Sequence, residues 1–280
     1  MDTRHNIAEI APHGVGPLLR RWRESRHLSQ LGLALEAEVS ARHISFVETG
    51  RATPSREMLL TLSNVLDVPL RERNVLLQAA GYAPVYRETS LDDPRMAQVR
   101  TALDLILKQH EPRSAICFDR HWNLVMVNKA YARLMIAAFG HEIPGLEPMT
   151  LLARGKFNLL KLLFEPDGIR KFIVNWEPLA KALINEAYQS ASWARDETMQ
   201  RLIAEVLAYP GVSTRWREPD LEAPQALMLP FEMKIGDSVA RFFSTVTTLG
   251  KPQDVTLQEL HIEAFYPADA TTEALTLLPE

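Results

Sequence analysis

Polar side chains that could contact a nucleic acid cluster in one short stretch, LSQLGLALEAEVSARHISFVETGRATPS, residues 28–55. An arginine guanidinium can donate two parallel hydrogen bonds to a guanine edge, and serine or glutamine side chains can bind phosphates. Arg42 is the strongest candidate in this stretch for reading a base. The same residues could instead belong to two buried helices of a structural domain, so the fold around them decides their role.

Serine residues divide this part of the chain into short helices. Ser29, Ser40 and Ser55 each precede a helix-forming run and can accept a hydrogen bond from its first turn, as N-cap serines do. The second and third helices are joined so tightly that they must cross steeply, as in a helix-turn-helix. With one helix before these and two after them, the sequence predicts an all-α, five-helix domain over residues 16–82.

The third of these helices is expected to have an inward and an outward face. Ile44 and Val47 are spaced to pack inward, and Ala34 on the preceding helix is small enough for a close crossing. Because an arginine paired with guanine discriminates by roughly 1–3 kcal/mol, Arg42 should contribute most to specificity. Phe46 has no hydrogen-bonding group and could contact only a thymine methyl. The outward side chains are those of Ala41, Arg42, His43, Ser45 and Phe46.

The spaced residues LSQ…LA…A-x-VS-x-x-x-IS-x-x-E-x-GR-x-x-PS make residues 16–80 similar to XRE-type, phage-repressor-like helix-turn-helix domains. The resemblance implies a double-stranded DNA operator as partner. It implies that Gln30 holds a phosphate and orients the reading side chains, and that Arg51 lies at the DNA backbone. It also implies an ion pair between Arg23 and Glu48. The residues expected at DNA are Gln30, Ser40, Ala41, Arg42, His43, Ser45, Phe46 and Arg51.

One position departs from the XRE-type pattern. The family usually has glycine in the turn between the second and third helices, where this chain has Glu38. A non-glycine residue held at positive φ costs roughly 1–2 kcal/mol. We therefore expect the turn to differ slightly from that of the family.

The chain divides into two parts of different charge. Its 280 residues, 46% hydrophobic and 24% charged, suffice for two globular domains and do not indicate disorder. Residues 1–87 carry 11 basic against 9 acidic residues, whereas the rest carries 20 against 26. A slightly basic head on an acidic body suits a DNA-binding module joined to a second domain. We expect a flexible leader at 1–15, the helical domain at 16–82, a linker at 83–92 and a second domain at 93–280.

The second domain is expected to be α+β. Its first element, DDPRMAQVRTALDLILKQH, is an amphipathic helix that could belong to the core, a dimer interface or a signalling connector. SAICFD and NLVMVN predict a β-hairpin, and Asn128 is placed to cap the next helix. A helical middle and three further strand-like runs follow, up to LQELHIEAFYPAD. The order predicts a five-stranded antiparallel sheet with a helical insertion.

This order of strands and helices resembles the PAS fold. AICFDRHWNLVMVNKAY, NLLKLLFEP, VNWEPLA and FEMKIGDSV…LHIEAFYPAD are more specifically similar to the ligand-binding domain of MmyB-like regulators, over about residues 90–270. That family joins such a body to an XRE-type head in the order found here, so the two resemblances support each other. Together they imply a transcriptional regulator that binds its operator as a homodimer.

The PAS-like resemblance implies a cavity between the sheet and the helices, which is the default small-molecule site. No dense group of inward charges is evident, so we expect a small apolar or amphiphilic ligand, such as a fatty acid. The same residues could instead fill a closed core, which would make the body a ligand-free dimerisation or protein-interaction module. The side chains expected to line the cavity are Met126, Met135, Phe157, Leu163, Phe164, Trp176, Phe231, Phe243 and Ile262.

Motifs for catalysis, metals or cofactors are absent from the sequence. It lacks GxSxG, HExxH, P-loop and GxGxxG patterns, so we expect no enzyme, and an unrecognised enzymatic sensor is the alternative. His261 and Glu263 share a strand face and are expected at the surface rather than at a metal. The single cysteine, Cys117, is expected in the core. One cysteine, no signal peptide and no apolar run of about 20 residues indicate a cytoplasmic protein.

Overall fold

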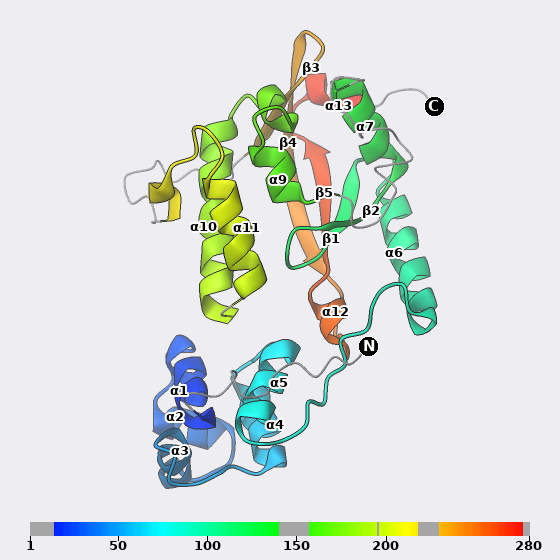
Figure 1. Cartoon of the computed structure of the whole chain (residues 1–280). Helices are drawn as coiled ribbons and strands as arrows, with labels where there is room; N and C mark the ends of the chain where they lie inside the picture. Colours follow the sequence, from blue (N-terminus) through cyan, green and yellow to red (C-terminus); the bar gives the residue numbers. More distant parts are fainter. Residues whose placement is uncertain (1–13, 140–156, 195, 218–229, 277–280) are drawn as a thin grey trace, which may run out of the picture. The chain divides into compact units, whose positions relative to one another are not determined.

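The chain folds into two compact units (Figure 1). The first unit comprises the chain up to Thr89 together with Lys251–Gln258, and the second comprises the remainder. Residues 251–258 therefore belong to the N-terminal unit, although the sequence placed them in the second domain. The leader predicted for residues 1–15 lies almost entirely outside the described residues. The computed structural model describes residues 14–139, 157–194, 196–217 and 230–276.

The N-terminal unit is helical, as predicted. Its three predicted N-caps are confirmed, because the hydroxyls of Ser29, Ser40 and Ser55 accept first-turn N–H bonds at 2.9, 3.1 and 3.2 Å. Each cap satisfies one backbone donor that the helix cannot pair internally. The helices are α1 (Val15–Ser25), α2 (Gln30–Glu36), α3 (Ala41–Glu48), α4 (Arg56–Val65) and α5 (Leu70–Ala79).

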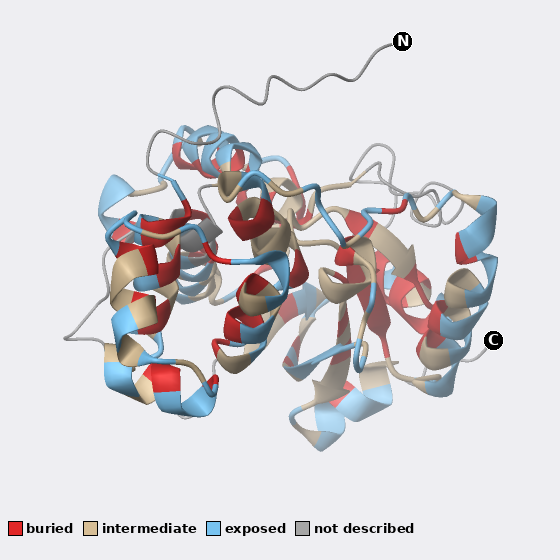
Figure 2. Cartoon of the chain, turned by 90° about the horizontal axis from the view of Figure 1, so that it is seen from below, coloured by how far each residue is buried: buried red, intermediate tan, exposed pale blue. Residues whose placement is uncertain are grey.

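An apolar core holds these helices together, and buried residues lie on their inward faces (Figure 2). Ile44 and Val47 are fully buried and Ala34 is 2% exposed, which confirms the predicted inward face and the small residue at the α2–α3 crossing. Gly16 brings α1 close to the end of α3. A Cβ at this position would lie 2.5 Å from the Val47 carbonyl oxygen, so the approach requires glycine.

A short helix from far along the chain, α12 (Val255–Gln258), completes the N-terminal unit. The Gln258 Oε1 accepts the Leu70 backbone N–H at 2.6 Å, at the first residue of α5. This side chain replaces a local cap, because the N-cap residue of α5, Pro69, makes no side-chain capping bond. Asp254 also accepts a hydrogen bond from the Thr89 hydroxyl at 2.6 Å.

The second unit contains a five-stranded antiparallel sheet in the order β2-β1-β5-β4-β3, which confirms the predicted fold class. Strand β5 lies between β1 and β4, so Glu263 is opposite Ile116 on one side and Val246 on the other. The strands are β1 (Ala115–Phe118), β2 (Leu124–Val127), β3 (Phe231–Ile235), β4 (Ser238–Thr248) and β5 (His261–Pro267).

Helices surround this sheet, and those between β2 and β3 form the predicted helical insertion (Figure 1). Phe164 and Ile184 are fully buried in a second apolar core that joins α9, α10 and α11. None of the described helices is both long and apolar enough to span a bilayer. The elements are η2 (Pro94–Met96), α6 (Ala97–Gln109), α7 (Lys129–Phe139), α9 (Leu159–Phe164), η3 (Ile169–Phe172), α10 (Trp176–Ala194), α11 (Glu197–Leu207), η4 (Thr214–Arg217) and α13 (Ala270–Thr276).

Asn128 joins the first hairpin to the helices beside it. Its Oδ1 accepts the Tyr131 N–H at 2.9 Å, which confirms it as the cap of α7, and the Ala115 N–H at 3.0 Å. Its Nδ2 donates to the backbone carbonyls of Arg113 and Leu107 at 2.7 and 3.2 Å. The side chain is 4% exposed, so these bonds satisfy an amide that burial would otherwise leave unpaired.

Candidate functional site

Helix α3 carries the residue expected to read a base on an exposed surface. Arg42 is exposed, while Ser45 and Phe46 are half-buried. The guanidinium of Arg42 lies over the Phe46 ring, 5.2 Å from its centroid, in a cation–π contact. Phe46 therefore supports the arginine, a role that its sequence position did not predict.

A buried carboxylate fixes α3 to its two neighbours. Arg23 donates from Nε and Nη2 to the two Glu48 oxygens at 2.7 and 2.9 Å, which confirms the ion pair implied by the family resemblance. The hydrogen bond and charge of Glu48 raise the pKa of Arg23 against the effect of burial. Gln30 Nε2 donates to the same carboxylate at 2.8 Å, so Glu48 links α1, α2 and α3.

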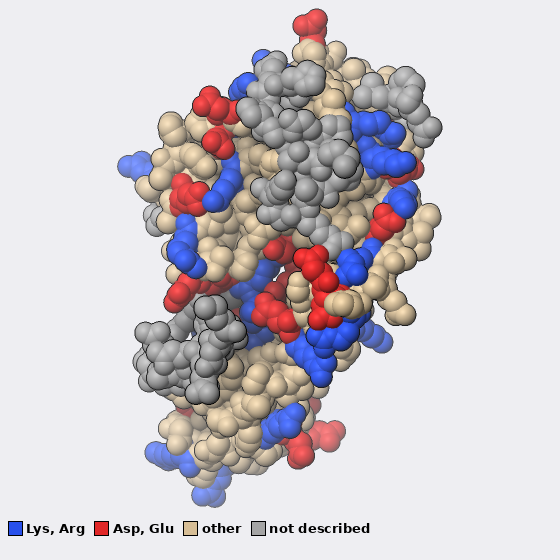
Figure 3. Space-filling model, turned by 45° about the vertical axis from the view of Figure 1, so that its right-hand side comes forward, with Lys and Arg blue, Asp and Glu red and all other residues tan. Residues whose placement is uncertain are grey.

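The other predicted DNA-facing residues lie near the start of α3 or just after its end. Ser40 is the exposed N-cap, and Ala41 and His43 are half-buried in the first turn. Arg51 is exposed beyond the helix. On the side of the molecule shown in Figure 3, basic and acidic side chains are interspersed.

Glu38 adopts the left-handed conformation for which the family usually uses glycine. Its φ is 55° in the turn between α2 and α3. The turn thus keeps a glycine-type conformation, where we had expected a slightly different one. The chain accepts the steric cost of a Cβ at this position.

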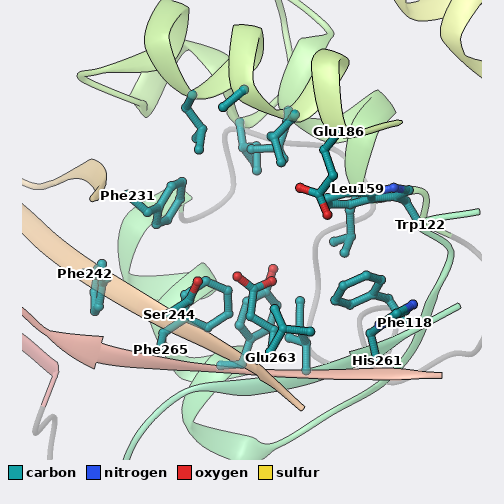
Figure 4. A pocket seen from close by; sticks show the side chains of 18 of the residues that line it. Phe118, Trp122, Leu159, Glu186, Phe231, Phe242, Ser244, His261, Glu263 and Phe265 are labelled. Carbon is teal, nitrogen blue, oxygen red and sulfur yellow. The ribbon is translucent and has the colours of Figure 1, made fainter. Parts of the chain in front are cut away.

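A cavity of about 630 Å³ lies between the sheet and the helices of the second unit (Figure 4). Strands β1, β3, β4 and β5 contribute lining residues from the sheet, and helices α7, α9 and α10 contribute lining residues from the helical side. Most of the lining side chains are apolar or aromatic. The volume falls within the range of about 300–1,000 Å³ that small-molecule sites occupy.

Three of the nine predicted ligand-site residues line this cavity: Met135, Leu163 and Phe231. Phe164 lies instead in the core between the helices, and Trp176 packs edge-on against it with 5.9 Å between ring centroids. Phe157 packs against the core on the sheet side. These three aromatic residues fill space that supports the cavity, without lining it.

Met126, Phe243 and Ile262 do not line the cavity because they lie on the wrong strand face. Alternate residues of a strand point to opposite faces of the sheet. Phe242 lines the cavity, so its neighbour Phe243 points to the opposite face of β4. Glu263 also lines the cavity, so its neighbour Ile262 points away from it on β5. Met126 is paired with Cys117, which flanks the cavity-lining residues of β1. Cys117 is buried, as expected.

His261 and Glu263 line the cavity, which corrects the expectation that both lie at the surface. The His261 ring stacks on Phe118 with 5.3 Å between ring centroids. Burial lowers the pKa of His261, although the charges of Asp119 and Glu259 act in the opposite direction, so the environment favours the neutral ring. Within the described part of the chain, no group of three or more His, Cys, Asp and Glu could hold a metal ion.

Two carboxyl groups point into the cavity from opposite walls, Glu186 from α10 and Glu263 from β5 (Figure 4). Burial raises the pKa of both. The pKa of Glu263 is lowered by a hydrogen bond from Ser244 and raised further by the charge of Glu186. The helical period could have revealed Glu186, because it follows Leu179 by seven residues and Leu183 by three, on the predicted apolar face.

Arg120, also at the cavity, is held by acidic side chains of the protein. It donates to Asp196, and its Nη1 donates to Glu259 at 2.9 Å. Burial disfavours the charged form of Asp196, but hydrogen bonds from His121, the Met199 N–H and Arg120 hold its pKa well below the usual range. The arginine charge is therefore neutralised within the protein.

Family models match both units of this chain. The model of the MmyB-like transcription regulator ligand binding domain matches residues 99–278, and a helix-turn-helix model matches residues 19–73. Both describe transcription regulators and not enzymes. No curated protein matches the chain. Since the first match alone covers more than half of the sequence, this chain belongs to the MmyB-like transcription regulators, with an XRE-type DNA-binding head and a ligand-binding body.

Proposed function

We propose that this regulator reads a specific operator through α3 and responds to a small apolar or amphiphilic molecule in the cavity of its body. The observation that carries the proposal is the cavity itself, with its volume of about 630 Å³ and mainly apolar walls. A body that served only as an interaction module would be expected to fill this space with side chains. A fatty acid is one molecule whose chain suits such walls.

The proposed DNA contacts combine one base-reading side chain with several that position the helix. Arg42, supported by the ring of Phe46, would reach a guanine edge from the exposed face of α3. Gln30 and Arg51 would bind the phosphate backbone. We further propose that two copies bind as a homodimer in the cytoplasm, on half-sites one helical turn apart.

Arg42→Ala should lower the preference for the selected operator over scrambled DNA by about tenfold to a hundredfold, the cost of one bidentate base contact. Arg42→Lys is the matched control for charge, because it keeps the cation but loses the guanidinium fork. It should retain general DNA affinity and lose specificity. Binding titrations on both duplexes measure the two effects. Unchanged preference in Arg42→Ala would show that another residue reads the operator.

Mass spectrometry of an organic extract tests the ligand half of the proposal. Purified full-length protein should release an apolar or amphiphilic molecule in stoichiometric amount, against a buffer control. Leu183→Trp places a larger side chain on the α10 wall of the cavity and should abolish this release. Equal release from the variant would mean that the molecule binds elsewhere.

A further inference from the structure

Glu186 and Glu263 are two acidic side chains in the lining of a mainly apolar cavity. Within the described residues, neither carboxyl group takes part in an ion pair, and Ser244 is the hydrogen-bond partner of Glu263. Glu263 is half-buried and Glu186 keeps exposed surface within the open cavity. Burial disfavours an unpaired carboxylate, which a proton or a cation would stabilise. The two face one another across open space, so the cation could come from a bound molecule (Figure 4).

Among the described residues, the other ionisable side chains that line the cavity do not supply that cation. The charge of Arg120 is taken by Asp196 and Glu259. Burial disfavours the charged form of His261, whose ring stacks on Phe118. Asp119, which also lines the cavity, is acidic and accepts three hydrogen bonds from the loop that follows it.

This charge distribution selects among amphiphiles that share the same apolar chain. A carboxylate head would lie against two groups of like charge and would require at least one of them to take up a proton. A protonated amine would instead be attracted to both carboxyl groups. The aromatic lining also favours a cation, because the face of each ring carries partial negative charge.

We propose that the ligand of this cavity is an amphiphilic amine, whose protonated nitrogen binds between Glu186 and Glu263 while its apolar part lies against the surrounding apolar walls. This inference rests on the proposed ligand-binding function and specifies the polar end of the ligand. The two carboxyl groups contribute from different elements, one helix and one strand, so the amine would also bridge the two walls of the cavity.

Three probes with the same chain and different heads test the proposal: decylamine, decanol and decanoic acid. Binding to the full-length protein at neutral pH is measured by isothermal titration calorimetry. Decylamine should bind about tenfold or more tightly than the other two. Glu186→Gln and Glu263→Gln should each remove most of that advantage without weakening decanol binding. Glu177→Gln, on the same helix but outside the cavity lining, is the matched control and should change nothing.

The outcomes separate this proposal from the proposed function. If decanoic acid or decanol binds more tightly than the amine, and Leu183→Trp blocks that binding, the cavity is a ligand site but the amine assignment is wrong. An amine preference that survives both glutamine substitutions also overturns the assignment. If none of the three probes binds and the purified protein yields no extractable ligand, the ligand-binding function itself fails.

Discussion

Glu38, Glu186 and Glu263 show that individual residues of this chain are not placed for maximum stability. Glu38 holds a backbone conformation that favours glycine, and the other two put carboxyl groups into an apolar cavity. Natural proteins tolerate such costs where function needs them or where the total stability suffices. Each cost can be measured by replacing a single side chain.

Glu38→Gly should stabilise the head by about 1 kcal/mol, because glycine adopts a φ of 55° without steric cost. Chemical denaturation of the full-length protein measures the change in the free energy of unfolding, taken from the unfolding transition of the head. Glu36→Gly is the control, since Glu36 is the last residue of α2 and has no positive φ, so the same substitution should not stabilise there. A destabilising Glu38→Gly would mean that the glutamate makes a favourable contribution larger than its backbone cost.

Glu263→Gln should stabilise the ligand-free protein at neutral pH by roughly 1 kcal/mol, and not in acid. The raised pKa of Glu263 means that the folded state holds its proton more tightly than the unfolded state. Its stabilising contribution is present below the ordinary glutamate pKa of 4.5 and is lost as the pH rises through the folded value. Melting temperatures of the wild type and of Glu263→Gln, measured from acid to neutral pH, test whether the variant gains stability only as the pH rises. A constant difference would exclude titration of Glu263 as the cause.

At the scale of elements, the sequence predicted the helices of the head better than the cavity of the body. Caps are local, so Ser29, Ser40 and Ser55 could be recognised from their neighbours alone. The strand faces were harder, because all four residues of β1 are buried and no polar alternation marks the cavity side. On β5 the residues do alternate, and the apolar Ile262 was expected to face the cavity, but the face that carries Glu263 lines it instead.

Asn128→Ala should destabilise the body by about 2–3 kcal/mol, because the Ala115 and Tyr131 N–H groups and two carbonyls lose their buried partner. Asn128→Asp should recover only part of this, since it can accept the two N–H bonds but cannot donate. Urea unfolding of the full-length variants measures both. Equal stability of wild type and alanine variant would mean that water replaces the amide.

At the scale of the whole molecule, the head is not one continuous piece of sequence. Residues 251–258 belong to it, yet they connect β4 to β5 of the body. The sequence did not predict that residues 251–258 belong to the head, because the linker expected at residues 83–92 marks only the first passage between the units. Gln258 and Leu70, at the start of α5, are 188 positions apart in the sequence, so no local pattern reveals their hydrogen bond.

Gln258→Ala should destabilise the head by about 1 kcal/mol, the usual effect of losing a helix N-cap. The neighbouring Gln253 is exposed, and Gln253→Ala should leave stability unchanged. Hydrogen exchange at the first residues of α5 measures the effect locally. Unaltered protection there in Gln258→Ala would show that the side chain does not act as a cap.

The return of residues 251–258 to the head has a consequence for how such regulators can be recombined. A head expressed alone from a truncated gene would lack Gln258 and Asp254, and with them the bonds to Leu70 and Thr89. A chimera made at the linker would combine one protein's α5 with another protein's α12. Exchange of heads between regulators of this kind therefore requires two replacements, the N-terminal segment and the β4–β5 connection, made together.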